Sequence, residues 1–215
     1  MQRTLINVTF HGIGRPSRAL EAGEAAVWVD LQRFTATLDL VAGREDVRVT
    51  FDDGNRSDLT RGLPALRARG LHATFFVVAG RLDEPEFLST ADVRELREAG
   101  MTIGSHGLRH RPWRRLDDAE LEEELVRSRA VLEDVVGAPV TAAACPFGSY
   151  DRRVLRALQR AGYEHVFTSD RGPARAGDWL QARTTITQET SLGDVLGPRP
   201  ASLKRRVELV AKRWR

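Results

Sequence analysis

Four glycines, each placed between a predicted helix and a predicted strand, limit the fold of this chain more than any other feature. They are Gly70, Gly100, Gly137 and Gly162. The residue after a helix often takes a left-handed conformation, which glycine adopts most easily. A recurring order of helix end, glycine and strand predicts parallel strands with helices between them. In such folds the functional residues lie at the carboxyl ends of the strands.

Hydrophobic periodicity and helix-start residues predict the individual elements. We predict strands at 4–10, 47–51, 73–78, 101–104, 140–145, 164–168 and 180–186. We predict helices at 30–41, 57–69, 90–99, 117–136, 151–161 and 202–213. Together they predict an α/β protein: a single distorted (β/α)7-type barrel over residues 1–198, followed by a basic amphipathic helix over residues 199–215.

The composition is that of a globular protein with one domain. The 215 residues are 41% hydrophobic and 29% charged, which is ordinary for a soluble chain. The single cysteine, Cys145, excludes an intramolecular disulfide, and we expect it to be a small core residue. We find no apolar run of 18 residues and no secretion signal, so we expect a cytoplasmic protein.

The last seventeen residues concentrate positive charge. Residues 199–215 contain seven basic side chains and one acidic side chain, with apolar residues at roughly helical spacing. One interpretation is a helix that packs on or beside the barrel. The other is peripheral contact with the anionic inner face of a membrane. No nucleic-acid recognition motif accompanies the segment, so we expect no nucleic-acid partner.

Two groups of polar residues follow predicted strands. Asp52 and Asp53 end the strand at 47–51, and His106 and His110 follow the strand at 101–104. A catalytic divalent metal needs a few imidazole and carboxylate ligands and an open position for water. A hydrolase also needs a carboxylate off the metal to take the water's proton. Either pair alone could be structural, but their joint placement predicts a metallohydrolase.

These residues carry a resemblance to a known family. Thr50-Phe51-Asp52-Asp53-Gly54 resembles the first motif of the NodB-homology polysaccharide deacetylases, carbohydrate esterase family 4. His106-Gly107-Leu108-Arg109-His110 resembles the second motif, with Gly107 where the family usually has a hydroxyl residue.

The later motifs of the family are only partly present. Ala144-Cys145-Pro146-Phe147-Gly148 resembles the third motif, with Ala144 in place of the usual arginine. Asp178-Trp179, with Arg183 after it, resembles the fourth motif. The fifth motif, Leu-x-Ile-x-His, is missing, because no histidine follows His165.

The resemblance implies a role for each matching residue. Asp53, His106 and His110 would bind one divalent metal, with Zn²⁺ expected and Co²⁺, Ni²⁺ or Mn²⁺ as alternatives. Asp52 would be the general base. The backbone N–H of Phe147, between Pro146 and Gly148, would help the metal to stabilise the tetrahedral oxyanion.

The departures from the family pattern need replacements. His11 ends the first predicted strand, so it could protonate the leaving amine in place of the missing histidine; the alternative is a turn residue. Arg183 could supply the charge that Ala144 lacks, or form a surface ion pair. Trp113 and Trp179 flank site motifs and could stack on a sugar or pack in the core.

The predicted function is removal of an N-acetyl group from an amino sugar in a polysaccharide, an oligosaccharide or a lipid-linked glycan precursor. One alternative is a deformylase or another amidohydrolase on the same scaffold. The other is a glycan-binding relative without catalytic activity, which the motif departures allow.

Overall fold

The computed structural model describes residues 3–197. The basic helix predicted over residues 199–215, and the membrane contact considered for it, lie outside the described residues. Within the described part, no helix combines the length and the apolar character needed to cross a bilayer.

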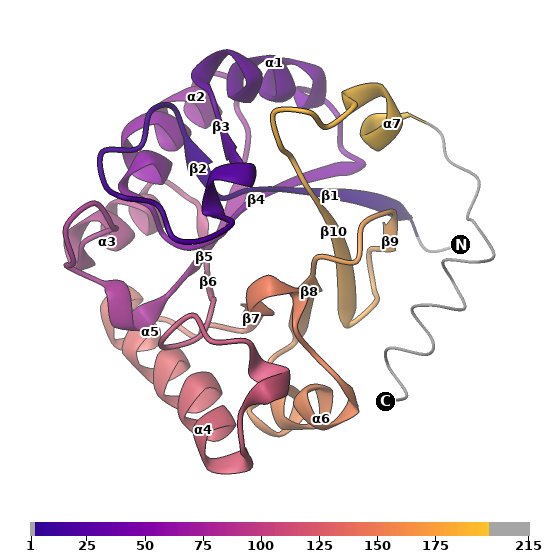
Figure 1. Cartoon of the computed structure of the whole chain (residues 1–215). Coiled ribbons are helices and arrows are strands. Elements are labelled where there is room, and N and C mark those ends of the chain that lie inside the picture. The colour runs from indigo at the N-terminus through magenta and orange to yellow at the C-terminus, as the bar shows by residue number, and fades with distance from the viewer. Residues whose placement is uncertain (1–2, 198–215) are drawn as a thin grey trace.

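Within residues 3–197, seven parallel strands form a closed barrel, as the sequence predicts (Figure 1). Neighbouring strands pair in sequence order, and β1 pairs with β10 to close the sheet. The barrel strands are β1 (Thr4–Phe10), β4 (Val47–Phe51), β5 (Ala73–Val77), β6 (Thr102–Ser105), β7 (Ala142–Ala144), β8 (His165–Thr168) and β10 (Leu180–Thr185).

The helices lie outside the barrel and connect its strands (Figure 1). Their positions agree with the predicted ranges to within a few residues. They are α1 (Leu31–Val41), a π-helical turn (Asp58–Gly62) that continues into α2 (Leu63–Arg67), α3 (Thr90–Glu98), α4 (Asp118–Glu122), a second π-helical turn (Glu123–Arg127) that continues into α5 (Ser128–Val136), and α6 (Arg152–Arg160).

Several short elements were not predicted, because two to five residues show no clear periodicity. They are β2 (Gly12–Ile13), β3 (Trp28–Val29), β9 (Ala174–Arg175) and α7 (Leu192–Leu196). β2 and β3 pair with each other in the long segment between β1 and α1. Gly12 is required there, because a Cβ atom would lie 2.3 Å from the Trp28 ring.

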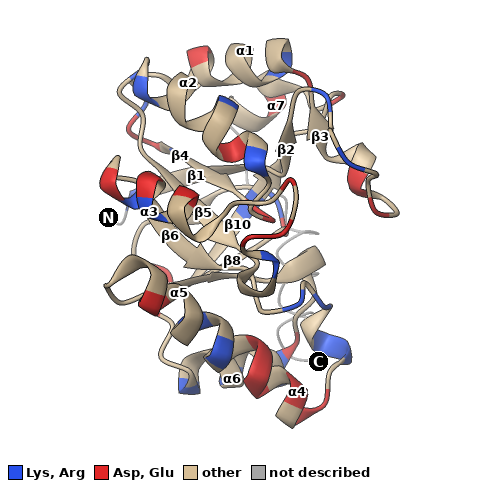
Figure 2. Cartoon of the chain, turned by 90° about the vertical axis from the view of Figure 1, so that its left-hand side faces the viewer, with Lys and Arg blue, Asp and Glu red and all other residues tan. Residues whose placement is uncertain are grey.

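Alternate residues of the strands face either the helices or the barrel interior. On the outer side, Phe10 and Phe51 pack against Phe34 of α1 in the largest apolar cluster. The interior holds Phe76 and Phe167, whose rings are 5.0 Å apart, with the Arg183 guanidinium beside both. Charged side chains otherwise lie mainly on helices and loops (Figure 2). A buried arginine at the mouth of the barrel therefore requires a specific partner.

Candidate metal centre and catalytic pocket

Six of the predicted site residues line one pocket of about 260 Å³ at the carboxyl ends of the strands: His11, Asp52, Asp53, His106, His110 and Phe147. His11 follows β1, the two aspartates follow β4, and both histidines of the second motif follow β6. Residues 21–24, which belong to the segment carrying β2 and β3, form one wall of the pocket. The sequence predicted the floor of the pocket but not this wall.

A left-handed turn separates the two neighbouring carboxylates. Asp53 has φ +76° and Gly54 has φ +71°, so the chain leaves the extended conformation directly after Asp52. A non-glycine residue at such a φ is uncommon and costs on the order of 1 kcal/mol. The turn allows Asp53 to face the histidines while Asp52 points into the barrel.

Asp53, His106 and His110 offer three donor atoms that lie within 4.8 Å of one another. Asp53 Oδ1 lies 3.2 Å from His110 Nε2 and 3.5 Å from His106 Nε2. Ligands bound tetrahedrally at about 2.0–2.1 Å would be roughly 3.3 Å apart. Asp53 Oδ1 is also buried and accepts no hydrogen bond within the described residues. The three residues therefore fit a divalent metal.

Hydrogen bonding fixes which nitrogen of His106 faces the cluster. His106 Nδ1 lies 2.9 Å from the carbonyl oxygen of Ala144, so it carries the proton and donates it. The lone pair of Nε2 is then free for a metal. Burial would lower the pKa of His106, but Asp52 and Asp53 raise it above its usual value in the metal-free protein.

A buried glutamate that sequence reasoning missed holds the histidine loop. The Glu124 carboxylate accepts hydrogen bonds from the backbone N–H groups of Leu108 (2.9 Å) and Arg109 (3.0 Å). It is fully buried. Gly107 has φ +83°, and a Cβ atom there would lie 2.6 Å from Glu124 Oε2. The contact explains why this chain has glycine where the family usually has a hydroxyl residue.

Arg183 forms an ion pair with Asp52. It supplies the positive charge that Ala144, in place of the motif arginine, does not. Its Nη1 lies 2.6 Å from Asp52 Oδ1 and its Nη2 lies 2.7 Å from Asp52 Oδ2, in a bidentate pair. Both side chains are buried. Burial would raise the pKa of Asp52, but the Arg183 guanidinium outweighs it and holds that pKa below the usual range. Asp52 is therefore an ionised carboxylate at neutral pH.

His11 also lies in the pocket, with its Nε2 atom 3.8 Å from Asp52 Oδ2. The side-chain amide of Asn55 donates a 2.6 Å hydrogen bond to the His11 carbonyl and holds this turn beside the aspartates. Burial lowers the pKa of His11 and outweighs the nearby carboxylates, so the ring is neutral at pH 7. The catalytic role of His11 stays a prediction.

Asp58 is a further buried carboxyl group near the site. Both of its side-chain oxygens are buried. Burial and the charges of Asp53 and Asp52 raise the pKa of Asp58 well above its usual value. Its only sequence signal was its place at the start of a predicted helix.

The two tryptophans predicted at the sugar site lie elsewhere: Trp113 belongs to the core, and Trp179 is partly buried against the same apolar cluster. Trp113 is fully buried, and its indole lies beneath Gly107. Trp179 precedes β10 at the far end of the barrel, where its indole N–H donates to the Tyr163 carbonyl. Neither lines the catalytic pocket. The sequence could not distinguish the two outcomes, because aromatic residues beside a motif serve either purpose.

The third motif places an exposed aromatic ring at the pocket mouth. Phe147 has φ +57° and is 64% exposed, between the buried residues Pro146 and Gly148. Its ring centroid lies 4.5 Å from that of His110. The role of the Phe147 backbone N–H at an oxyanion stays a prediction.

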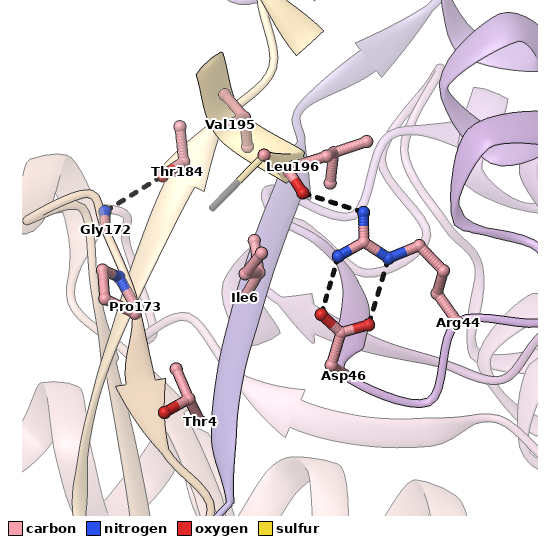
Figure 3. A pocket seen from close by; sticks show the side chains of 10 residues that line it. Thr4, Ile6, Arg44, Asp46, Gly172, Pro173, Thr184, Val195 and Leu196 are labelled. Atoms are coloured by element: carbon pink, nitrogen blue, oxygen red, sulfur yellow. Dashed lines mark hydrogen bonds and ion pairs between the residues drawn. The ribbon is translucent and has the colours of Figure 1, made fainter. Parts of the chain in front are cut away.

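A cavity of about 350 Å³ elsewhere contains none of these residues (Figure 3). It lies against the outer side of β1, near Ile6, and is bounded by Arg44, Asp46 and α7. Arg44 forms hydrogen bonds of 3.0 and 2.6 Å to Asp46 and also donates to the Leu196 carbonyl. Arg44 and Asp46, the ionisable side chains among the described residues of this cavity, therefore satisfy each other.

The profile of the polysaccharide deacetylase family matches residues 41–166. This is more than half of the chain, and the chain belongs to that family. YxkH of Bacillus subtilis is 25% identical over 146 residues, 68% of this chain and 52% of that protein. A peptidoglycan-N-acetylglucosamine deacetylase of Bacillus cereus is 28% identical over 124 residues, 57% of this chain and 56% of that enzyme. The chain thus spans about half the length of these relatives.

Solved structures show the same fold. A polysaccharide deacetylase from Bacillus cereus superposes with a TM-score of 0.79 at 20% identity, over 91% of this chain and 68% of that one. A Streptococcus pyogenes deacetylase, solved in complex with acetate, gives 0.73 at 20% identity, over 91% of this chain and 98% of that one. The barrel and the family predicted from the motifs are confirmed.

Proposed function

We propose that this protein hydrolyses the N-acetyl group of an amino sugar within a glycan and uses one zinc ion. One observation carries the proposal. Asp52 is paired bidentately with Arg183, while its neighbour Asp53 faces two histidines with an oxygen that accepts no hydrogen bond. Family membership supports the class of substrate.

Asp53, His106 and His110 would hold the metal. One carboxylate and two imidazoles are a donor set suited to zinc, and they leave positions open. A divalent cation bound there would polarise the acetamide carbonyl and lower the pKa of a water molecule. Co²⁺, Ni²⁺ and Mn²⁺ accept similar donors, so metal analysis of the purified protein decides between them.

Asp52 accepts the proton of the attacking water. Arg183 holds the carboxylate in place by two hydrogen bonds and keeps it ionised. General-base catalysis of this kind is worth about 10²–10⁴ in rate. The water's oxygen adds to the acyl carbon, and the carbon–nitrogen bond then breaks.

His11 returns the proton to the leaving nitrogen. It is neutral at pH 7, so it can accept the proton that Asp52 has taken once Nε2 and Oδ2, now 3.8 Å apart, come within hydrogen-bond distance, and then donate it to the amine. The products are acetate and a free amino sugar. The backbone N–H of Phe147 would donate to the oxyanion, which is typically worth about 3 kcal/mol.

The test measures metal content and acetate release on the wild type and on Asp52→Asn, with a panel of N-acetylated and N-formylated oligosaccharides. Asp46→Asn, outside the pocket, is the control. We expect about one metal per chain in all three proteins, and acetate from the wild type and the control alone. A wild type without metal would overturn the proposal. Release of formate but no acetate would assign a deformylase instead.

A further inference from the structure

A second pocket, of about 440 Å³, lies beside the catalytic pocket and shares Phe147 with it. Its other lining residues are Pro112, Arg114, Arg115, Gly148, Ser149 and Tyr150. Because Phe147 lines both pockets, its ring is the wall between them. A chain of linked sugars could therefore cross this ring and occupy both pockets.

The shared wall is suited to a sugar ring. Phe147 is among the few large apolar side chains in the described residues that remain mostly exposed. Its contact with His110 fixes the ring at the pocket mouth. A pyranose has an apolar face of C–H groups that packs on an aromatic ring, and pockets for small ligands are commonly lined in this way.

The far side of the second pocket carries an excess of positive charge. Arg114 and Arg115 are both exposed. Arg114 Nε lies 3.9 Å from Asp151 Oδ2, and that carboxylate also accepts a hydrogen bond from the Val154 N–H. Arg115 makes no ion pair with any described residue.

Nearby acids have other partners. Asp118 pairs with Arg153 at 2.6 Å, and the Asp117 carboxylate caps α4 through the Glu120 N–H. The carboxylate of Asp170 accepts a hydrogen bond from the Tyr150 hydroxyl. Of the two guanidinium groups of the pocket, that of Arg114 lies 3.9 Å from one carboxylate, Asp151, and that of Arg115 pairs with none among the described residues. An anion would supply the missing acceptor, since a guanidinium binds carboxylate or phosphate oxygens in a planar, bidentate way.

We propose that the second pocket is a subsite for an acidic sugar linked to the N-acetylated unit. The inference rests on the proposed function, which places the acetamide in the catalytic pocket. It assigns the substrate to glycans in which the unit next to the acetylated amino sugar carries a carboxylate or a phosphate. Phe147 contacts the sugar face, and Arg114 and Arg115 bind the anionic group.

The test uses three disaccharides that share the N-acetylated amino sugar, joined to a neutral hexose, a hexuronic acid or a hexose phosphate, in both linkage orders. The zinc-loaded wild type is compared with the double variant R114Q/R115Q. The control is R67Q/R97Q, which removes the same charge from exposed arginines in the last turns of α2 and α3. The readout is kcat/KM for each acidic disaccharide divided by that for the neutral one.

We expect the ratio to be about five in the wild type and in the control at low salt, since exposed charge pairs are worth up to about 1 kcal/mol each. It should fall towards one in R114Q/R115Q, and in the wild type at high salt. The carboxylate and phosphate arms show which anion is preferred. A ratio of one in the wild type, or an unchanged ratio in R114Q/R115Q, would overturn the subsite.

Binding separates this inference from the proposed function. If no disaccharide releases acetate, the proposed function fails, and calorimetric titration of the same proteins still decides the subsite. Tighter binding of the acidic disaccharides by the wild type than by R114Q/R115Q would support it. Equal affinity for acidic and neutral disaccharides would contradict it.

Discussion

The mouth of the barrel and its outer side next to β1 each have a cavity lined with ionisable groups, yet they differ in how those groups are satisfied. In the outer cavity Arg44 and Asp46 bind each other (Figure 3). At the mouth, Asp53 Oδ1 faces two histidines, is buried and accepts no hydrogen bond from any described residue. Buried polar groups in native proteins are nearly always paired, so an unpaired carboxylate oxygen between two imidazoles fits a metal ligand. Pairing, rather than cavity size, distinguishes the site.

The largest expected effect is on metal binding at the mouth. His106→Ala removes one of the three metal ligands. We expect the affinity for zinc to fall about 10³-fold, which corresponds to roughly 4 kcal/mol. His165→Ala, at the start of β8, is the control and should keep the metal. Competition with a coloured chelator measures both. Equal metal affinity of the two variants would show that Asp53 and the two histidines do not form the metal site.

The next effect concerns the ion pair of Arg183 and Asp52. Arg183→Gln leaves a buried carboxylate without its cation, so the pKa of Asp52 should rise and the base should be protonated at pH 7. We expect acetate release to fall about 100-fold at pH 7.

The pH profile checks this cause. The wild type loses activity as pH falls through the low pKa of Asp52, and Arg183→Gln should lose it at a higher pH. Arg183→Lys keeps one charge and should lie between the two. Breaking a buried pair costs about 3–5 kcal/mol, so unfolding is measured in parallel. If the activities of the wild type and of Arg183→Gln fall over the same acidic pH range, the role given to Arg183 is contradicted.

A smaller effect is expected where Glu124 positions the histidine loop. Gly107→Ser restores the hydroxyl residue usual in the family but places its Cβ against Glu124 Oε2. Metal affinity should fall about tenfold, as for the loss of a group that orients a ligand. Glu124→Gln should act similarly, while Glu122→Gln, at an exposed position of α4, should not. Unchanged affinity in Gly107→Ser would show that the loop adjusts freely.

Asp58 should affect stability rather than binding. Its pKa is raised in the folded protein, so the folded state holds a proton that the unfolded chain releases near pH 4. Stability therefore falls as pH rises from about 4 through the folded-state pKa. Asp58→Asn removes this fall and should be more stable at pH 7 by on the order of 1 kcal/mol.

Chemical denaturation at pH 5 and pH 8 measures the effect. Asp134→Asn, on the exposed side of α5, is the control and should keep the pH dependence of the wild type. A pH dependence that is the same in Asp58→Asn and the wild type would show that Asp58 is not the group responsible.

The smallest effect is expected at the outer cavity. Arg44→Gln breaks a half-exposed pair, which is typically worth less than about 1 kcal/mol. Metal content and acetate release should not change. A loss of either would mean that the two cavities are coupled, and the comparison between them would fail.

The amino-acid sequence determined the barrel and the grouping of Asp53, His106 and His110. The glycines after the helices and the alternating strands specify βα units, because these signals are local and repeat along the chain. The parallel strands bring their carboxyl ends to one edge, so Asp53 and His106 had to be neighbours once the fold was known.

Only the tertiary structure decided which distant side chains act on these groups. Arg183 lies 131 residues from Asp52, and Glu124 contacts the backbone of another segment, which no local pattern encodes. The same held for Trp113 and Trp179, because an aromatic side chain suits a core as well as a sugar site. Packing buries Trp113 fully and Trp179 partly. Short-range patterns determine secondary structure and strand order, whereas the pairing of buried charges depends on three-dimensional contacts between residues far apart in the chain.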